Sequence, residues 1–311
     1  MKILVTGGAG FIGSHLVEAL LAKGHQIRVL DDLSSGHLDN LLGLNVDFVE
    51  GSVSDYECVQ EVMRDIELVY HQAALVSVPK SVENPALNHA VNVTGTFNVF
   101  EAARVEGVSR IVYASSAAVY GNDPKLPKEE HDAIAPITPY AMAKRTSELT
   151  AVVYAQMYGL ESVGLRYMNV FGPRQDPSSP YSGVLSIFSQ RALAGDGVTI
   201  FGDGEQTRDF VFVKDVVQAN LLAGFKPILE AEKAVWFNVG RGVQTSLNDI
   251  VAMLRHICDQ PLPITYQPVR QGDIQHSVAD IQKIQEQLGF EPETAVVDGL
   301  RQTLALFKEN Q

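Results

Sequence analysis

Short apolar runs alternate with longer amphipathic segments through the first half of the chain. The runs are rich in β-branched residues, which predicts buried strands at residues 2–6, 26–31, 45–49, 67–71, 110–114 and 161–166. Between them, apolar residues recur at helical spacing, which predicts helices at 11–23, 56–64, 85–106 and 139–158. Strands and helices that alternate in this way predict a parallel sheet with helices on both faces.

The pattern loosens in the second half. Residues 171–180 are rich in Gly, Pro and Ser, which predicts a turn-rich passage into a second region. We expect helices at 183–194, 215–225 and 247–257, the last capped by Ser246, and strands at 209–213 and 235–239. Residues 128–132 are expected to form a solvated loop.

A glycine-rich turn joins the first predicted strand to the first helix. Gly7, Gly10 and Gly13 would let the backbone approach a pyrophosphate that lies on the helix N-terminus. Asp31 and Asp32 end the second predicted strand, where a carboxylate accepts hydrogen bonds from an adenosine ribose. Because a carboxylate there repels a 2′-phosphate, we expect NAD and not NADP.

Tyr140 and Lys144 stand four residues apart on a predicted helix, so both lie on one face. A phenol with a pKa of about 10 is a poor base near neutrality, and a nearby ammonium would lower its pKa. With Ser116 upstream, after the fifth predicted strand, this pattern predicts redox chemistry at a hydroxyl group.

Composition narrows the class of protein. The 311 residues carry a net charge of −13, so no broad basic surface is available for nucleic acid or an anionic membrane. No apolar stretch reaches the roughly 18 residues of a membrane span, and the start runs straight into the glycine turn. Cys58 and Cys258 are distant, and the eight histidines lack metal spacing. We expect a cytoplasmic enzyme with reduced thiols and no metal.

Several motifs resemble those of a known superfamily. The extended short-chain dehydrogenase/reductases carry motifs that resemble residues 6–15 and 115–121, together with Tyr140 and Lys144. The likeness runs along nearly the whole chain. Within that superfamily, residues 166–175 and 201–210 look like those of nucleotide-sugar 4-epimerases. The likeness is closest to the UDP-N-acetylglucosamine 4-epimerases.

The resemblance implies an α/β fold with a Rossmann-like doubly wound parallel sheet and a smaller C-terminal substrate-binding α/β domain. The NAD-binding Rossmann domain would comprise residues 1–166, rejoined by about 209–240. Residues 167–208 and 241–311 would form the UDP-sugar-binding domain. The family likeness also implies a homodimer that pairs through helices including the one that carries Tyr140.

The same resemblance assigns residues to the cofactor. Ser52 departs from it, because relatives carry Asp at that position to bind adenine. The residues expected to bind NAD are Gly7, Gly10, Phe11, Ile12, Gly13, Asp31, Asp32, Ser35, Gly36, Ser52, Val53, Ala73, Ala74, Asn92, Tyr140, Lys144 and Tyr167.

The catalytic residues implied by the resemblance are Ser116, Tyr140 and Lys144. Tyr140 would remove the proton of the sugar 4-hydroxyl while C4 gives hydride to the nicotinamide, which leaves a 4-keto sugar. Ser116 would bind the same oxygen, and Lys144 would also bind the nicotinamide ribose. For epimerisation, the keto sugar turns over and hydride returns to its other face.

The second half is expected to bind the UDP diphosphate. Arg208 and Arg270 suit bidentate contacts with phosphate, although they could instead form surface ion pairs. The resemblance adds further residues to this site. The substrate-binding residues are expected to be Ser77, Ser116, Asn169, Thr199, Phe201, Arg208, Arg270, Asp273 and Ser277.

Ser277 aligns with a position at which a bulky Tyr restricts some epimerases to UDP-glucose and UDP-galactose. A small residue there leaves room for an N-acetyl group, but a roomy pocket rejects the smaller sugar only modestly. We therefore expect interconversion of UDP-N-acetylglucosamine and UDP-N-acetylgalactosamine, with UDP-glucose and UDP-galactose as further candidates.

Other functions share part of the site. A 4,6-dehydratase or a decarboxylase would need acidic residues after Ser116, where this chain has Ala117 and Ala118. A non-catalytic NAD sensor would be expected to lack Tyr140 or Lys144. UDP-glucose 4-epimerisation remains an alternative. UDP-glucuronate 4-epimerisation is another, because Arg208 or Arg270 could meet a sugar carboxylate.

Overall fold

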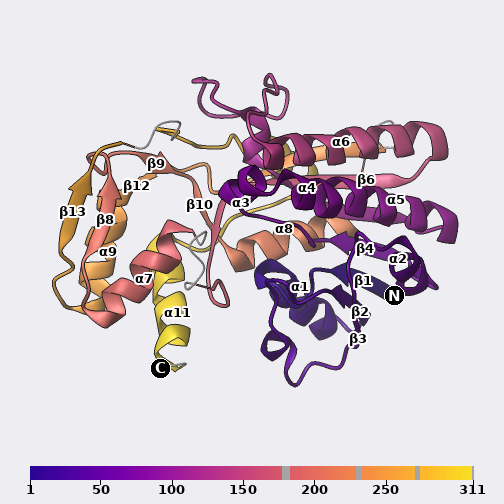
Figure 1. The fold of residues 1–311 in the computed structure, drawn as a ribbon, viewed down its shortest axis with the longest axis horizontal. Coiled ribbons are helices and arrows are strands. Elements are labelled where there is room, and N and C mark those ends of the chain that lie inside the picture. The colour runs from indigo at the N-terminus through magenta and orange to yellow at the C-terminus, as the bar shows by residue number, and fades with distance from the viewer. Residues whose placement is uncertain (177–182, 229–232, 270–273, 310–311) are drawn as a thin grey trace.

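A seven-stranded parallel sheet forms the larger part of the fold, as expected (Figure 1). The computed structural model describes residues 1–176, 183–228, 233–269 and 274–309. The strand order is β11-β6-β5-β4-β1-β2-β3, so the winding direction reverses between β1 and β4. In open α/β sheets, ligands bind at the carboxyl ends of the strands at such a reversal. The strands are β1 (Lys2–Thr6), β2 (Gln26–Asp31), β3 (Asp47–Glu50), β4 (Leu68–His71), β5 (Arg110–Ser116), β6 (Glu161–Tyr167) and β11 (Ala234–Val239).

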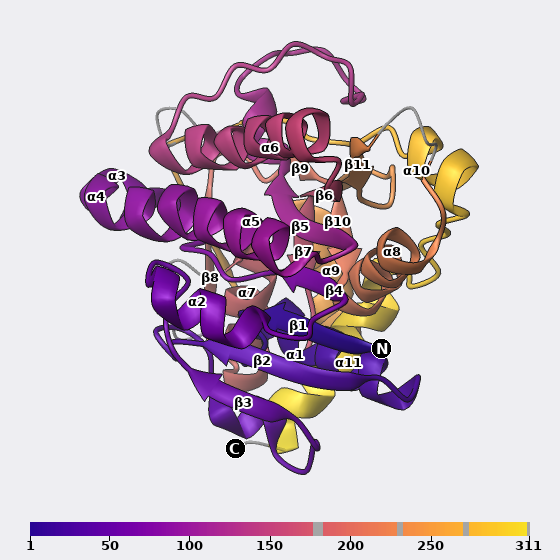
Figure 2. The ribbon, with the colours of Figure 1, turned by 90° about the vertical axis from the view of Figure 1, so that its right-hand side faces the viewer.

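Helices cover both faces of the sheet (Figure 2). On one side lie α1 (Phe11–Ala22), α8 (Val213–Phe225) and α10 (Gln282–Leu288). On the other lie α2 (Tyr56–Met63), α5 (Gly95–Glu106) and α6 (Pro139–Tyr158). Successive side chains of a strand point to opposite faces, so Ile3 and Val5 join one core and Leu4 joins the other.

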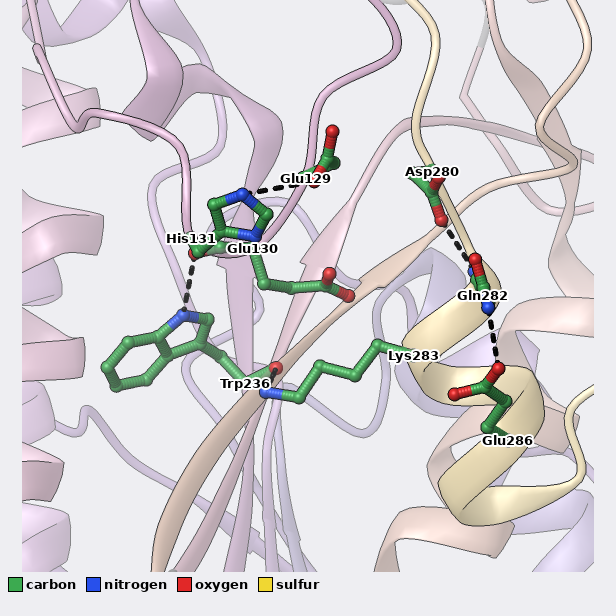
Figure 3. A pocket seen from close by; sticks show the side chains of 8 residues that line it. All are labelled: Glu129, Glu130, His131, Trp236, Asp280, Gln282, Lys283 and Glu286. Atoms are coloured by element: carbon green, nitrogen blue, oxygen red, sulfur yellow. Dashed lines mark hydrogen bonds and ion pairs between the residues drawn. The ribbon is translucent and has the colours of Figure 1, made fainter.

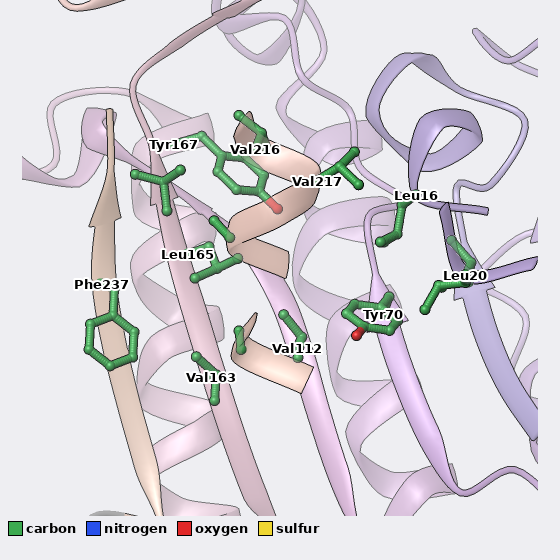
Figure 4. Packing of buried hydrophobic residues seen from close by; sticks show 14 of the residues in the cluster. Leu16, Leu20, Tyr70, Val112, Val163, Leu165, Tyr167, Val216, Val217 and Phe237 are labelled. Atoms are coloured by element: carbon green, nitrogen blue, oxygen red, sulfur yellow. The ribbon is translucent and has the colours of Figure 1, made fainter. Parts of the chain in front are cut away.

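The core beneath α1 and α8 consists of aliphatic and aromatic side chains in direct contact (Figure 4). Leu16 and Leu20 of α1 face Tyr70 of β4, while Val216 of α8 lies over Tyr167 of β6. Burying each such side chain contributes about 1.5–3 kcal/mol to folding. This packing holds the first helix, and with it the glycine turn, against the sheet.

A smaller lobe lies beyond the carboxyl ends of the strands, at the left of Figure 1. Its core contains side chains of α7 (Val184–Ala194), α9 (Leu247–Cys258), α11 (Val296–Glu309) and the parallel pair β8 (Val198–Phe201) and β13 (Ile264–Gln267). Ser246 caps α9 with Asp249 in a reciprocal capping box, as its sequence position predicted. Two further short strand pairs are β7 (Asn169–Phe171) with β10 (Phe210–Phe212), and β9 (Thr207–Arg208) with β12 (Thr245–Ser246).

The predicted helix at 85–106 is three segments in the structure. They are α4 (Pro85–Asn88), a π-helical turn (His89–Thr94) and α5. The sequence patterns also missed α3 (Val78–Glu83), α10, α11 and the short strands β7, β8, β9, β12 and β13. Short 3₁₀ turns at Leu38–Leu41 and Ala117–Tyr120 complete the fold. Strands of two to four residues carry too few positions for a period of two to be visible.

The free edge of β11 is covered by side chains. Glu130 Oε1 accepts the Asn238 N–H at 2.7 Å, and Lys283 Nζ donates to the Trp236 carbonyl at 3.2 Å. The expectation of a solvated loop at 128–132 is therefore wrong for Glu130, and also for Lys128, which is buried. Burial raises the pKa of the Glu130 carboxyl. A strand edge covered in this way is protected from pairing with another chain.

A pocket lies beside this edge (Figure 3). None of the residues expected to bind NAD or substrate lines it, so it is separate from the site described below. Its lining residues are Glu129, Glu130, His131, Trp236, Asp280, Gln282, Lys283 and Glu286.

Cys58 and Cys258 are free thiols. Within the described ranges, no helix is both long and apolar enough to cross a bilayer. Nor do three or more His, Cys, Asp or Glu side chains of those ranges gather where they could hold a metal ion. The cytoplasmic location stays a prediction.

Candidate active site

The glycine turn between β1 and α1 leaves no room for side chains. Gly7 has a φ of +70°, and a Cβ there would lie 2.6 Å from the Ala73 nitrogen. A Cβ on Gly13 would overlap the Gly7 carbonyl oxygen. Gly10, the N-cap residue of α1, has no side chain to cap the helix, so the first N–H groups remain available for an anion. These features fit a dinucleotide whose pyrophosphate lies at the N-terminus of α1. Phe11 and Ile12 are in the first turn of that helix.

Asp31 lies at the carboxyl end of β2 and is buried. Its two carboxylate oxygens accept the backbone N–H groups of Ala9 and Leu33, each at 2.9 Å. Burial raises the pKa of this carboxyl, and these hydrogen bonds oppose the rise. A carboxylate has about four acceptor positions, so Asp31 retains capacity for ribose hydroxyls. Gly36 lies against the same carboxylate, while Asp32 and Ser35 are exposed.

Two expected cofactor residues use their side chains to hold other parts of the protein. Asn92, in the π-helical turn, accepts the Leu75 N–H at 2.8 Å and donates to the Leu75 carbonyl at 3.0 Å. The Tyr167 hydroxyl is hydrogen-bonded with Gln72 and Asn220 on the α8 side of the sheet. Asn92 therefore fixes the backbone after β4, next to Ala73 and Ala74.

The segment after β3 offers a hydroxyl where adenine was expected to bind. Ser52 Oγ is hydrogen-bonded with Ser54 Oγ at 2.9 Å, and the Val53 carbonyl accepts a hydrogen bond from Asn98 Nδ2 on α5. Val53 is buried and also limits the space at Gly95, where a Cβ would come within 2.6 Å of it. The short Ser52 side chain therefore leaves backbone groups as the main polar contacts in this segment.

Tyr140 lies in the first turn of α6, which Thr138 caps and Pro139 begins. Its backbone N–H donates to Ser81 Oγ at 3.3 Å, which joins α6 to α3. Its hydroxyl is hydrogen-bonded to the Ser116 side chain. The structure thus brings together the predicted base and the predicted serine.

The expectation that Lys144 lowers the pKa of Tyr140 is wrong for the protein without bound NAD. Burial raises the pKa of the phenol, and the hydrogen bond with Ser116 opposes the rise. Lys144 lies one turn along α6, with Nζ 5.8 Å from the centre of the Tyr140 ring. The expectation also counted on the positive charge of the nicotinamide. Lys144 is therefore only part of the positive charge needed to lower the pKa of Tyr140.

Lys144 is almost completely buried. Its Nζ donates to the Ala114 carbonyl of β5 at 2.8 Å, and burial lowers the pKa of the ammonium to about 8. An ammonium with a single carbonyl acceptor retains two donors. It can therefore donate to ribose hydroxyls at the ends of β4 and β5.

His71 connects the glycine turn to the helices of the opposite face. Its Nδ1 is hydrogen-bonded with Thr6 Oγ1 at 2.8 Å, and its Nε2 with Thr96 Oγ1 at 3.1 Å. Burial, helped by the charge of Lys144, lowers the pKa of His71 to about 3. The imidazole stays neutral and acts as a fixed link.

Backbone hydrogen bonds bring several predicted substrate residues together. The Asn169 N–H donates to the Asp209 carbonyl at 3.0 Å, which places Asn169 beside Arg208. The Ser277 N–H donates to the Thr207 carbonyl at 3.2 Å. Arg208 Nη1 donates to the carbonyls of Thr207 and Gln275.

Three other predicted substrate residues belong to β8 and to the cap of α3. Thr199 and Phe201 belong to β8, whose end is tied to the β9 segment by Gln206 Nε2 donating to the Phe201 carbonyl at 2.7 Å. Ser77 caps α3, one turn before the Ser81 that contacts Tyr140. Arg270 and Asp273 lie outside the described residues.

Sequence reasoning missed a buried ion pair beside the predicted catalytic residues. Arg166 Nε donates to Glu148 Oε1 at 2.7 Å, and both side chains are fully buried. A signal was present, because Glu148 follows Lys144 by four residues and falls on the same helical face. A charged residue on a buried face calls for a partner.

The burial of Lys144 predicts a trade between stability and function. A folded pKa of about 8, against about 10.5 unfolded, costs roughly 3 kcal/mol below pH 8, and this cost falls as pH rises toward 10.5. We expect Lys144→Met to raise the free energy of unfolding by about 1–3 kcal/mol at pH 7, with a smaller gain at pH 9.5. Urea unfolding of both proteins without added nucleotide tests this. A constant or negative difference would contradict the assigned cost.

Comparisons with known proteins agree with this geometry. The model of the NAD dependent epimerase/dehydratase family matches residues 3–240. The UDP-glucose 4-epimerase of Mycolicibacterium smegmatis is 40% identical over 314 residues, which cover 99% of both chains. A crystal structure of the Thermotoga maritima UDP-glucose 4-epimerase with UDP-glucose superposes with a TM-score of 0.95 at 40% identity, covering 100% of this chain and 99% of that one.

A second solved structure is similar to this chain over its whole length. The UDP-N-acetylglucosamine 4-epimerase of Methanobrevibacter ruminantium, in complex with UDP-N-acetylmuramic acid, superposes with a TM-score of 0.95. It is 35% identical, and the match covers 100% of this chain and 99% of that one. These matches confirm the resemblance drawn from the motifs and the expectation of NAD, and the chain belongs to the NAD dependent epimerase/dehydratase family.

Proposed function

We propose that this protein inverts C4 of UDP-sugars with bound NAD. The observation that carries the proposal is the contact of Tyr140 with Ser116, one helical turn from a buried Lys144, at the sheet edge that also carries the glycine turn. End-to-end likeness to sugar-nucleotide 4-epimerases supports it.

The proposed roles follow from the chemistry of each side chain. Bound NAD would accept a hydride from C4 and return it. Tyr140 would take the proton of the 4-hydroxyl and give it back, while Ser116 keeps the sugar oxygen in line with the phenol. Lys144 would hold the nicotinamide ribose and stabilise the phenolate.

The residues after Ser116 support an epimerase over a lyase. Ala117 and Ala118 form the start of the 3₁₀ turn that Ser116 caps, with the Ala118 N–H donating to Ser116 Oγ at 3.2 Å. Methyl groups can neither remove the C5 proton nor protonate a leaving hydroxyl. The 4-keto sugar would therefore persist until it turns over.

We further propose a division of labour within the chain. Residues 1–166, with about 209–240, would bind NAD, and the presence of β11 in the large sheet supports this division. Residues 167–208 and 241–311 would bind the UDP-sugar, with Asn169 and Arg208 at the diphosphate, together with Arg270. Thr199 and Phe201 would meet uracil, and Asp273 the UMP ribose.

The proposed substrates are UDP-N-acetylglucosamine and UDP-N-acetylgalactosamine, followed by UDP-glucose and UDP-galactose. Ser277 is small and half-buried, and its backbone N–H is held by the Thr207 carbonyl. Its short side chain supports the proposal that the pocket has space for an acetyl group at C2 of the sugar. The named substrates of relatives include both kinds of sugar. UDP-glucuronate is the second candidate, with Arg208 or Arg270 as the partner of its carboxylate.

Product analysis tests the reaction class. Purified protein given each UDP-sugar should yield the C4 epimer with unchanged mass, resolved by chromatography. Tyr140→Phe should lower the rate by at least about 100-fold while thermal unfolding stays within a few degrees of wild type. A product of lower mass would indicate a lyase, and near-normal turnover of the variant would refute Tyr140 as the base.

Substitution at Ser277 tests the proposed substrate choice. Ser277→Tyr should lower kcat/KM for the acetylated sugars more than tenfold relative to the plain sugars, because the ring would fill the space for the acetyl group. Ser277→Ala, the matched control, should leave this ratio within about twofold. Equal loss on both sugar classes after Ser277→Tyr would count against this role.

We propose a homodimer formed through α5 and α6, which lie side by side on one face (Figures 1 and 2). On α6, Met142, Leu149, Val153 and Met157 are each at least 48% exposed and follow one another at helical spacing. Phe97 and Val105 extend this apolar stripe on α5, at 50% and 47% exposure. A second copy related by a two-fold axis would cover the stripe with its own.

A charge in the stripe should separate the subunits. Val153→Glu is expected to give a monomer at micromolar concentration in sedimentation velocity, because dimerisation would bury its carboxylate without a partner. Val243→Glu replaces a Val of similar exposure, 49% against 51%, outside the stripe and should remain dimeric. Wild type that sediments as a monomer would refute the interface.

A further inference from the structure

We infer that Glu148 is a positioning residue for the proposed reaction: it fixes the register between α6 and the end of β5, and thereby keeps Ser116 against Tyr140. This inference rests on the catalytic roles proposed above for Tyr140 and Ser116. It concerns a side chain one helical turn beyond Lys144 that lies outside the motifs discussed so far.

Three consecutive residues of β5 contact three successive turns of α6. The Ala114 carbonyl accepts Lys144 Nζ at 2.8 Å, and Ser115 Oγ donates to Glu148 Oε1 at 2.8 Å. Ser116 then contacts the Tyr140 hydroxyl. Because Ser115 and Ser116 are consecutive residues of β5, a shift of the strand at Ser115 would also move Ser116.

Glu148 is itself held rigidly. Arg166 donates twice to its carboxylate, Nε to Oε1 at 2.7 Å and Nη2 to Oε2 at 2.9 Å. Arg145 adds a third contact from the same helix, with Nη1 to Oε2 at 2.8 Å. With Ser115 these donors use the roughly four acceptor positions of a carboxylate. Glu148 therefore has no free position for an acid or base role, and its contribution is geometric.

Arg166 anchors this carboxylate to the rest of the sheet. It pairs in register with Ser115 on the neighbouring strand, so both lie at the same level of the sheet. Its Nη1 donates to the Tyr120 hydroxyl at 2.9 Å, and its guanidinium lies 4.9 Å from the Tyr120 ring centre and 5.3 Å from that of Trp236. Strands β6 and β11 thus fix the position of Glu148.

The groups around Tyr140 determine how its pKa would change if α6 shifted relative to β5. Lys144 lies on its own helix, and His71 of β4 is held neutral between Thr6 and Thr96. Ser116 is the group of β5 whose hydrogen bond favours the phenolate. Weaker contact with Ser116 would therefore raise the pKa of Tyr140, whereas a purely structural ion pair would leave it unchanged.

Ser115→Ala tests the inference, because it disconnects β5 from Glu148 and leaves the ion pair with Arg166 intact. We expect kcat to fall about tenfold, with KM within twofold and the acid limb of the rate profile moved to higher pH. Ser162→Ala is the matched control, because Ser162 of β6 is fully buried and its hydroxyl has no hydrogen-bond partner among the described residues. Its kcat and pH profile should match those of wild type.

A spectroscopic titration gives a readout that does not depend on turnover. The phenolate absorbance near 295 nm, compared with that of Tyr140→Phe in each background, reports the Tyr140 pKa. Ser115→Ala should raise this pKa, and Ser115→Thr, which restores a hydroxyl, should return it toward wild type. Equal values in Ser115→Ala and Ser162→Ala would overturn the inference.

The two proposals fail separately. If wild type leaves every UDP-sugar unchanged, the proposed function fails while the titration still decides the role of Glu148. If Ser115→Ala is too unstable to titrate, Ser115→Cys keeps the side-chain size with a weaker donor. It should then give a pKa above that of wild type, and a value equal to wild type would refute the positioning role.

Discussion

The bidentate ion pair between Glu148 and Arg166 is the contact on which the arrangement of the proposed catalytic residues depends. It joins α6 to the sheet at the level of Ser115, next to Ser116 at the end of β5. Removing one partner of such a buried pair costs about 3–5 kcal/mol, because the other charge is left without compensation. A pair of this kind contributes less net stability than its geometry suggests, because both charges must leave water.

The same region carries a second buried charge with fewer contacts. Lys144 has the Ala114 carbonyl as its hydrogen-bond acceptor, and burial lowers its pKa to about 8. Four donors surround the carboxylate of Glu148, whereas the ammonium one turn away keeps unused donors. The contrast separates a group that holds the fold from a group that meets ligands.

The sequence allowed prediction of the large sheet, its main helices and the grouping of Ser116, Tyr140 and Lys144, because each depends on local pattern and spacing. Apolar runs marked the strands, and Tyr140 and Lys144 shared a helical face. The smaller lobe was harder, because its strands of two to four residues show no clear period. The π-helical turn at His89–Thr94 was invisible, since a helical apolar pattern continues through it. The direction of the Tyr140 pKa also depends on tertiary burial, which spacing along one helix cannot reveal.

The histidine at the end of β4 has a consequence for interpreting kinetics. Both nitrogens of His71 are hydrogen-bonded, and its pKa of about 3 keeps it uncharged through the range in which rates are measured. An inflection near pH 6 or 7 is commonly attributed to an imidazole because of its ordinary pKa. In this protein the imidazole that bridges the glycine turn and α5 is silent there. Such an inflection would therefore have to come from a group other than His71.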